Sequence, residues 1–175
     1  MGSGASSTAA GIPETAEAAR AAGHSQASID TFSTAYATAK DLLLRLKSES
    51  HPIDLPIKPH SERLGSGKRG LSLAFLLAFE DFVRENGGDP RADMSQICKG
   101  ESNPVSVCFL TASTGLSLAE SLAHLLGGVK ESPGLIGEAT TFFSYSWTGT
   151  SLSNVVASIG HAVANELAAA GVSSV

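Results

Sequence analysis

Apolar residues recur every three or four positions in four stretches of the chain, and this spacing is typical of helices with one buried face. The four predicted helices cover residues 30–47, 71–85, 116–126 and 151–170. The pattern is strongest in residues 71–85, where a stripe of Ala, Leu and Phe runs the whole length and two glycines follow it.

Polar residues and glycines mark where these helices begin and end. Asp30 is a candidate N-cap of the first helix, and Ser117 or Thr114 stands near the start of the third. Glycines make residues 64–70 a predicted loop, and residues 131–137 form another. These boundaries predict separate helices joined by flexible segments.

A different pattern stands just before the last helix. Residues 140–147 are an apolar and aromatic run that ends in a polar turn, which favours a buried strand. The helix 151–170 follows, and Gly171 and Val172 begin a new segment. A strand, a loop and a helix opening a second strand are the first unit of a parallel α/β sheet. We therefore expect an incomplete α/β fold, with open strand edges and a poorly soluble or molten chain.

Composition divides the chain into three predicted regions. Residues 1–28 are rich in Ala, Ser and Gly and predict a disordered or loosely helical arm that packs on nothing. Residues 29–103 predict a helical region with linkers rich in Pro and Gly, including an extended segment at residues 53–59. Residues 104–175 carry the predicted strand and the helix after it.

Charge and cysteine content exclude several classes of function. The net charge is −5, which argues against nucleic-acid binding because phosphates require clustered Lys and Arg. Cys98 and Cys108 are two widely spaced cysteines, and with His124 they lack the spacing of a zinc site. There is no secretory signal and no apolar run long enough for a transmembrane segment. We expect a cytoplasmic protein without a metal.

The end of the predicted strand is the candidate ligand site. Ser144, Tyr145, Ser146 and Trp147 follow the apolar run, and ligands of open α/β sheets bind beyond the carboxyl ends of strands. The next helix would present free backbone N–H groups to an anion such as a phosphate. The alternative is that the two serines satisfy local backbone groups and that the tryptophan packs on the helix.

Other motifs give little evidence of chemistry. Gly2 stands in an N-myristoylation pattern and is a lipidation candidate, which alone would give a weak membrane tether. Ser144 lacks the Gly-x-Ser-x-Gly pattern of a nucleophile elbow. His161 falls on the side or exposed face of the last helix and is expected to be a surface residue. We name no catalytic residue.

Residues 142–145, Phe-Phe-Ser-Tyr, resemble the first conserved box of Toll/interleukin-1 receptor (TIR) domains. The longer stretch 136–147 is similar to a TIR-like subgroup of algae and other protists, and residues 107–122 resemble the lead-in of that subgroup. The resemblance covers roughly residues 104–175 and implies strand A and helix A of a flavodoxin-like parallel sheet. Residues 148–150 lack the Asp that often follows the box.

The resemblance implies signalling through self-association or docking of protein partners. NAD cleavage by TIR domains requires a Glu on a later helix, and no Glu of this chain matches it. We therefore expect a non-catalytic interaction fragment with no cofactor, and NAD only in a full-length context. Two alternatives stay open: part of an NAD-hydrolysing TIR domain whose catalytic half is missing, or an unrelated helical protein.

Overall fold

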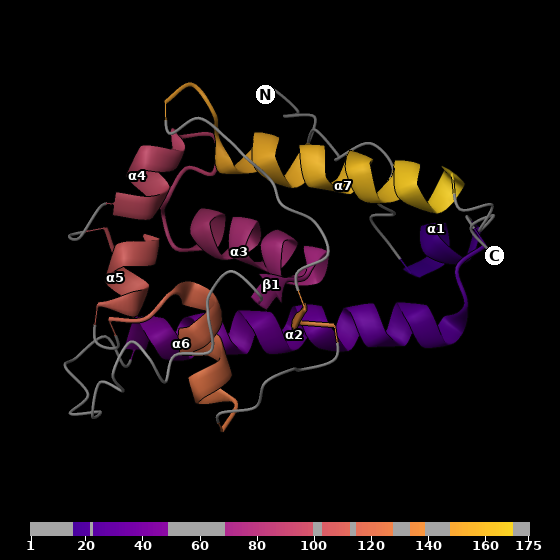
Figure 1. The fold of residues 1–175 in the computed structure, drawn as a ribbon, viewed down its shortest axis with the longest axis horizontal. Helices are drawn as coiled ribbons and strands as arrows, with labels where there is room; N and C mark the ends of the chain where they lie inside the picture. The colour runs from indigo at the N-terminus through magenta and orange to yellow at the C-terminus, as the bar shows by residue number, and fades with distance from the viewer. Residues whose placement is uncertain are drawn as a thin grey trace, which may run out of the picture.

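The computed structural model describes residues 16–21, 23–48, 69–99, 103–112, 115–127, 134–138 and 148–169. Within these ranges the chain is mainly helical, and two short strands pair with each other (Figure 1). The helices are α1 (Ala16–Ala21), α2 (Gln26–Ser48), α3 (Leu73–Glu85), α4 (Met94–Lys99), α5 (Val107–Thr111), α6 (Leu118–Leu125) and α7 (Leu152–Ala169). The strands are β1 (Arg69–Leu71) and β2 (Ile136–Glu138).

Helix α3 is the centre of the fold and packs against both α2 and α7 (Figure 1). Helices α2 and α3 run in the same direction, since Tyr36 is hydrogen-bonded to Asp81 and Lys40, one turn later, to Glu85. Helix α7 runs in the opposite direction to α3 (Figure 1). The three helices thus form a layered core in which α3 is covered on two sides.

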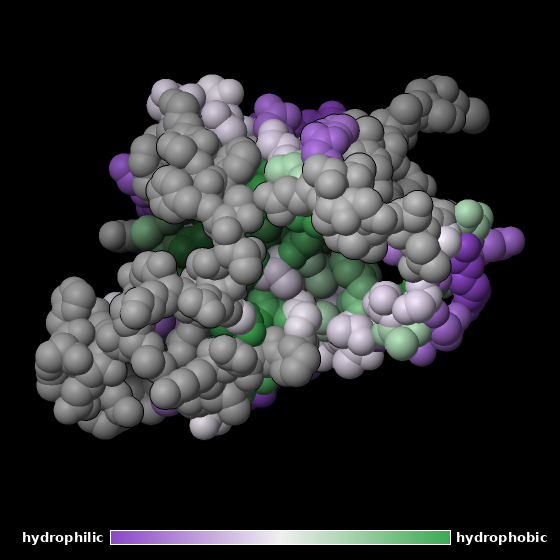
Figure 2. All heavy atoms as spheres, turned by 45° about the vertical axis from the view of Figure 1, so that its right-hand side comes forward, coloured by the Kyte–Doolittle hydropathy of each residue, from purple (hydrophilic) through white to green (hydrophobic). Residues whose placement is uncertain are grey.

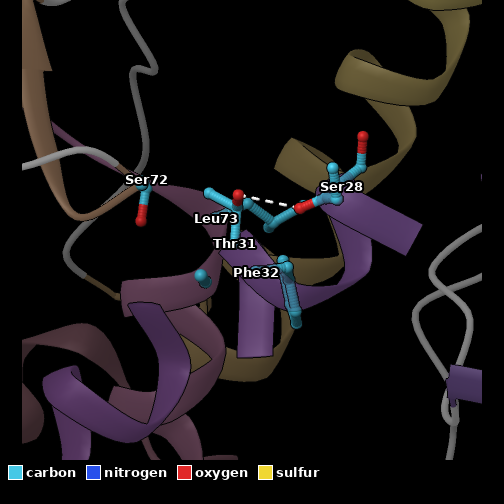
Figure 3. A pocket seen from close by; sticks show the side chains of 8 residues that line it. Ser28, Thr31, Phe32, Ser72 and Leu73 are labelled. Atoms are coloured by element: carbon cyan, nitrogen blue, oxygen red, sulfur yellow. Dashed lines mark hydrogen bonds between the residues drawn. The ribbon is translucent and has the colours of Figure 1, made fainter. Parts of the chain in front are cut away.

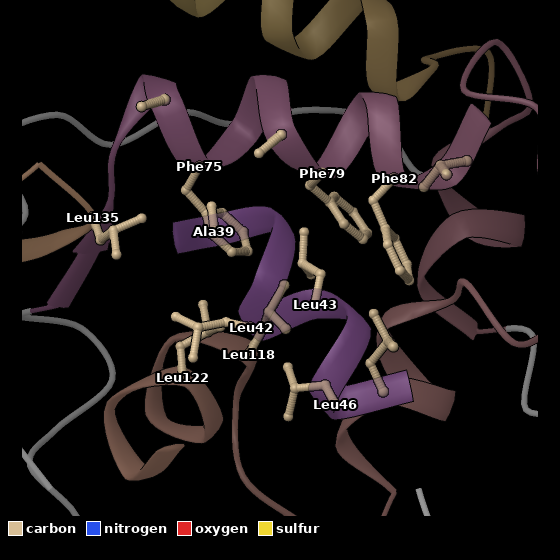
Figure 4. Packing of buried hydrophobic residues seen from close by; sticks show 14 of the residues in the cluster. Ala39, Leu42, Leu43, Leu46, Phe75, Phe79, Phe82, Leu118, Leu122 and Leu135 are labelled. Carbon is tan, nitrogen blue, oxygen red and sulfur yellow. The ribbon is translucent and has the colours of Figure 1, made fainter. Parts of the chain in front are cut away.

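Three phenylalanines of α3 form the middle of the core. Phe75, Phe79 and Phe82 are almost completely buried, and adjacent rings lie 6.3 and 6.4 Å apart in stacked pairs. They point toward the buried side of α2, and α6 adds two leucines beneath α2 (Figure 4). The α2 and α6 side chains of this cluster include Ala39, Leu42, Leu43, Leu46, Leu118 and Leu122.

The three central helices differ in length, so α2 and α7 extend beyond α3. At 1.5 Å per residue, α3 is about 20 Å long, α7 about 27 Å and α2 about 34 Å. The N-terminal part of α2 and the C-terminal part of α7 pass the start of α3 at the same end of the molecule (Figure 1). We call residues 26–34 of α2 the overhang. All of its residues are exposed except Ile29.

The predicted fold class is wrong. The two strands are antiparallel, with Arg69 opposite Glu138 and Leu71 opposite Ile136, and the described residues contain no parallel, flavodoxin-like sheet. Helix α7 packs its apolar stripe on a helix, α3, instead of on a sheet. An apolar stripe fixes which face of a helix is buried but not whether its partner is a helix or a sheet, and this ambiguity caused the error. The proposed strand within residues 140–147 lies outside the described residues.

The four predicted helices are confirmed, with changes at their ends. Leu71 belongs to β1, and Ser72 caps α3 by accepting a hydrogen bond from the backbone N–H of Phe75. Asp30 is not a cap, because α2 begins at Gln26 and Ser25 Oγ accepts from the backbone N–H of Ser28. Both strands arise from the ends of segments predicted as loops.

The last helix departs from the prediction on one face. Val155 and Val156 are buried, but Val163, which the helical period places within about 20° of Val156, is 38% exposed. Its partner α3 is shorter, and α7 extends past the start of α3 (Figure 1). His161 is exposed, as predicted. No helix among the described residues combines the length and hydropathy that crossing a membrane requires.

Candidate functional site

The predicted ligand residues Ser144, Tyr145, Ser146 and Trp147 lie outside the described residues, as does the lipidation candidate Gly2. The structure therefore neither brings them together nor separates them. The helix that follows the proposed site, α7, is described, and its first turn can be compared with the anion site that was predicted there.

Backbone donors at the start of α7 already have partners within the protein. The Ser153 N–H donates to the Pro90 carbonyl at 3.0 Å, and the Asn154 N–H donates to Ser151 Oγ at 3.2 Å. An anion at a helix N-terminus binds through such N–H groups, so engaging them here removes donors that the prediction required. The helix start is used to attach α7 to the turn after α3.

Further contacts complete this attachment. The Met94 N–H donates to the Thr150 carbonyl at 2.8 Å, and the Gly149 N–H donates to Asp93 Oδ1 at 3.1 Å. Asp93 and Ser151 also form an antiparallel bridge. We call these contacts, with the Ser153–Pro90 hydrogen bond, the α7 clasp. Their role is structural, since each one joins the entry of α7 to residues 90–94.

The ionisable side chains of α3 are paired with neighbouring helices. Asp81 accepts from the Tyr36 hydroxyl and from Arg84, and Arg84 also contacts Glu80 at 3.2 Å. Glu80 accepts from Ser153 Oγ of α7 at 2.6 Å. Burial, followed by the hydrogen bond to Asp81, raises the pKa of Tyr36 well above its usual range, so the phenol stays protonated into the alkaline range. Hydrogen bonds between these groups connect α2 and α7 to α3. Within α3, Arg84 forms ion pairs with Asp81 and Glu80.

The candidate metal and thiol residues do not form a centre. Cys98 and Cys108 are unoxidised and half-buried, and His124 is exposed at the end of α6. Among the described residues, no three His, Cys, Asp or Glu side chains come close enough together to bind a metal ion.

An open groove lies along the overhang, where the core formed by α3 begins (Figure 3). Helix α2 contributes Ala27, Ser28, Thr31 and Phe32. The opposite side comprises the first residues of the α3 segment and one glycine: Ser72, Leu73, Ala74 and Gly134. The groove has a volume of about 490 Å³. We call it the α2 groove.

The hydroxyl groups of the α2 groove are engaged within the protein. Thr31 donates to the Ala27 carbonyl at 2.8 Å, Ser28 is paired with Ser25 at 2.8 Å, and Ser72 accepts from the Phe75 N–H. The eight described lining residues carry no charge. What the groove offers to a ligand is therefore mainly apolar contact, with Phe32 as its largest side chain.

Phe32 continues the buried stripe of α2 past the point where α3 covers it. Ala39 is seven residues away and Leu43 eleven, so both lie within about 20° of Phe32 around the helix. Ala39 and Leu43 are fully buried, whereas Phe32 is 38% exposed. Helical position predicts burial for Phe32, and the shorter neighbouring helix explains its exposure.

Gly134 brings the chain close to the overhang. Its φ of +74° is in the region that favours glycine, and a Cβ at this position would lie 3.0 Å from Ala35 Cβ. Ser72, on the same side of the groove, donates its N–H to the Leu135 carbonyl at 2.9 Å. A glycine is therefore required for the 134–135 turn to form one side of the groove.

Sequence analysis did not find the α2 groove. It predicted a helix over residues 30–47, which includes Phe32, and a loop over residues 131–137, without a reason to bring the two together. The available signal was the difference in length between the apolar stripes at residues 30–47 and 71–85, which implies that one helix extends past the other. Figure 2 shows hydrophobic side chains in the middle of one face of the molecule and hydrophilic ones toward its right-hand edge. Comparison with protein-family models, with curated proteins and with solved structures finds no match to this chain.

Proposed function

We propose that this chain is a non-catalytic protein-interaction module and that the α2 groove binds its partner protein. The observation that carries the proposal is the exposure of Phe32. A large aromatic side chain that continues a buried stripe, and is 38% exposed beside an uncharged groove, is typical of an interaction anchor.

The surroundings of the groove favour binding over catalysis. Acid–base chemistry requires an ionisable group within reach of a substrate, and the eight described lining residues contain none. The ionisable side chains nearest the core, such as Asp81 and Glu80, are hydrogen-bonded to other helices. The groove is also shallow, because Ala27, Thr31 and Gly134 are exposed along it, so a small substrate would stay in contact with water.

The proposal agrees with the signalling role that the TIR resemblance implies, but it does not depend on that resemblance. Its basis is Phe32 and the groove, both within the described residues. The alternative, an NAD-hydrolysing domain, has no specific support among these residues, since the described lining of the groove contains no cation that could pair with a pyrophosphate.

Site-specific photo-crosslinking tests the proposal. A photo-reactive phenylalanine analogue replaces Phe32 in the full chain, and a matched chain carries it at Leu44, which is 51% exposed and lies about 120° around α2. We expect position 32 to crosslink to a discrete partner protein and position 44 to give little of the same product. The partner is then purified and its affinity for the chain is measured by calorimetry.

Aspartate substitutions complete the test. We expect Phe32→Asp to weaken binding of the purified partner by about tenfold or more, because it removes an apolar anchor and desolvates a charge, while Leu44→Asp changes it by less than about twofold. Circular dichroism verifies that both variants keep their helical content. Equal losses in the two variants, or unchanged binding by Phe32→Asp, would show that the groove is not the binding site.

A further inference from the structure

We draw no further inference here: the strongest candidate, the apolar face of the overhang where Phe32 lines the α2 groove, adds nothing to the proposed function, because nothing in the structure shows what covers it.

Discussion

The two halves of α2 carry the same apolar stripe but lie in different surroundings. In residues 35–48 the stripe is covered by α3 and α6, and Ala39 and Leu43 are fully buried. In the overhang, residues 26–34, the stripe reaches Phe32 with 38% of the side chain exposed. A single helix thus contributes to the core at one end and offers an apolar surface at the other. The boundary between the two parts is set by the length of α3, which covers only part of α2.

Polar contacts follow the same division. Beside the packed half, Tyr36, Lys40 and Lys47 of α2 are bonded to the α3 side chains Asp81 and Glu85 and to Asn86, which follows that helix. On the overhang, side-chain hydrogen bonds join residues close in sequence, such as Gln26 to Asp30 at 2.7 Å. These bonds support the helix locally, and one of them, from Arg20 of α1 to Gln26 at 2.8 Å, attaches it only to the short helix that precedes it. The overhang is therefore held mainly as a continuation of the packed half.

The largest test of this comparison substitutes one phenylalanine in each region. We expect Phe75→Ala to lower the free energy of unfolding by about 3–5 kcal/mol, because it leaves a cavity in the core. Phe32→Ala, the matched change on the overhang, should cost less than about 1 kcal/mol, since the side chain is already half in water. Urea denaturation followed by circular dichroism measures both. Similar losses would mean that the overhang is as well packed as the core.

A glycine substitution sharpens the boundary between the two regions. We expect Gly134→Ala to destabilise the fold by about 1–2 kcal/mol, because a positive φ strains any other residue and the new Cβ meets Ala35. Gly137→Ala is the control, since nothing lies within 4 Å of a Cβ there, and it should change stability by no more than about 0.5 kcal/mol. Thermal melts of the two variants provide the comparison, and equal effects would exclude the close approach as the cause.

The smallest effect is expected at Tyr36, where the packed half begins. Tyr36→Phe should cost about 1 kcal/mol at pH 7 through loss of the hydrogen bond to Asp81. Because the folded pKa of Tyr36 is raised above the unfolded value of 10.0, the unfolded chain loses this proton first and the wild type loses stability as the pH rises above 10. The Tyr36→Phe variant has no phenol proton to lose, so its stability does not fall for this reason.

Measurements at alkaline pH therefore test this expectation, because the direction of the change in stability is known. The difference in unfolding free energy between wild type and Tyr36→Phe should shrink from pH 8 to pH 11, as measured by urea denaturation in matched buffers. A difference that stays constant or grows would show that the phenol is not held in its protonated form by Asp81 and by burial.

Long periodic segments made the main helices predictable from sequence. The stripe in residues 71–85 predicted α3 and its buried phenylalanines, and Ser117 was named as a possible start of α6, where it forms a capping box with Glu120. The short elements were missed. Helices α4 and α5 have six and five residues, too few to show a period, and each strand has three.

The arrangement of the helices could not be predicted in the same way. The strand-like run before α7 predicted a parallel sheet, which the described residues do not contain, whereas packing between the helices at residues 71–85 and 151–170 was considered from the sequence and is observed between α3 and α7. The groove likewise depends on how far one helix extends past another and on the turn at Gly134 meeting Ala35. Such features arise from packing between distant segments, and no local pattern records them.

The α7 clasp has a consequence for which changes this chain can accept. Two of its bonds, Met94 to Thr150 and Ser153 to Pro90, join main-chain atoms, so they make few demands on side-chain identity. They do fix the number of residues between Thr150 and Val155. Inserting or deleting one residue there would rotate the helix by about 100° and turn Val155 and Val156 away from the core. For these two main-chain bonds the number of residues matters more than side-chain identity, because a change of length alters the register of the whole helix.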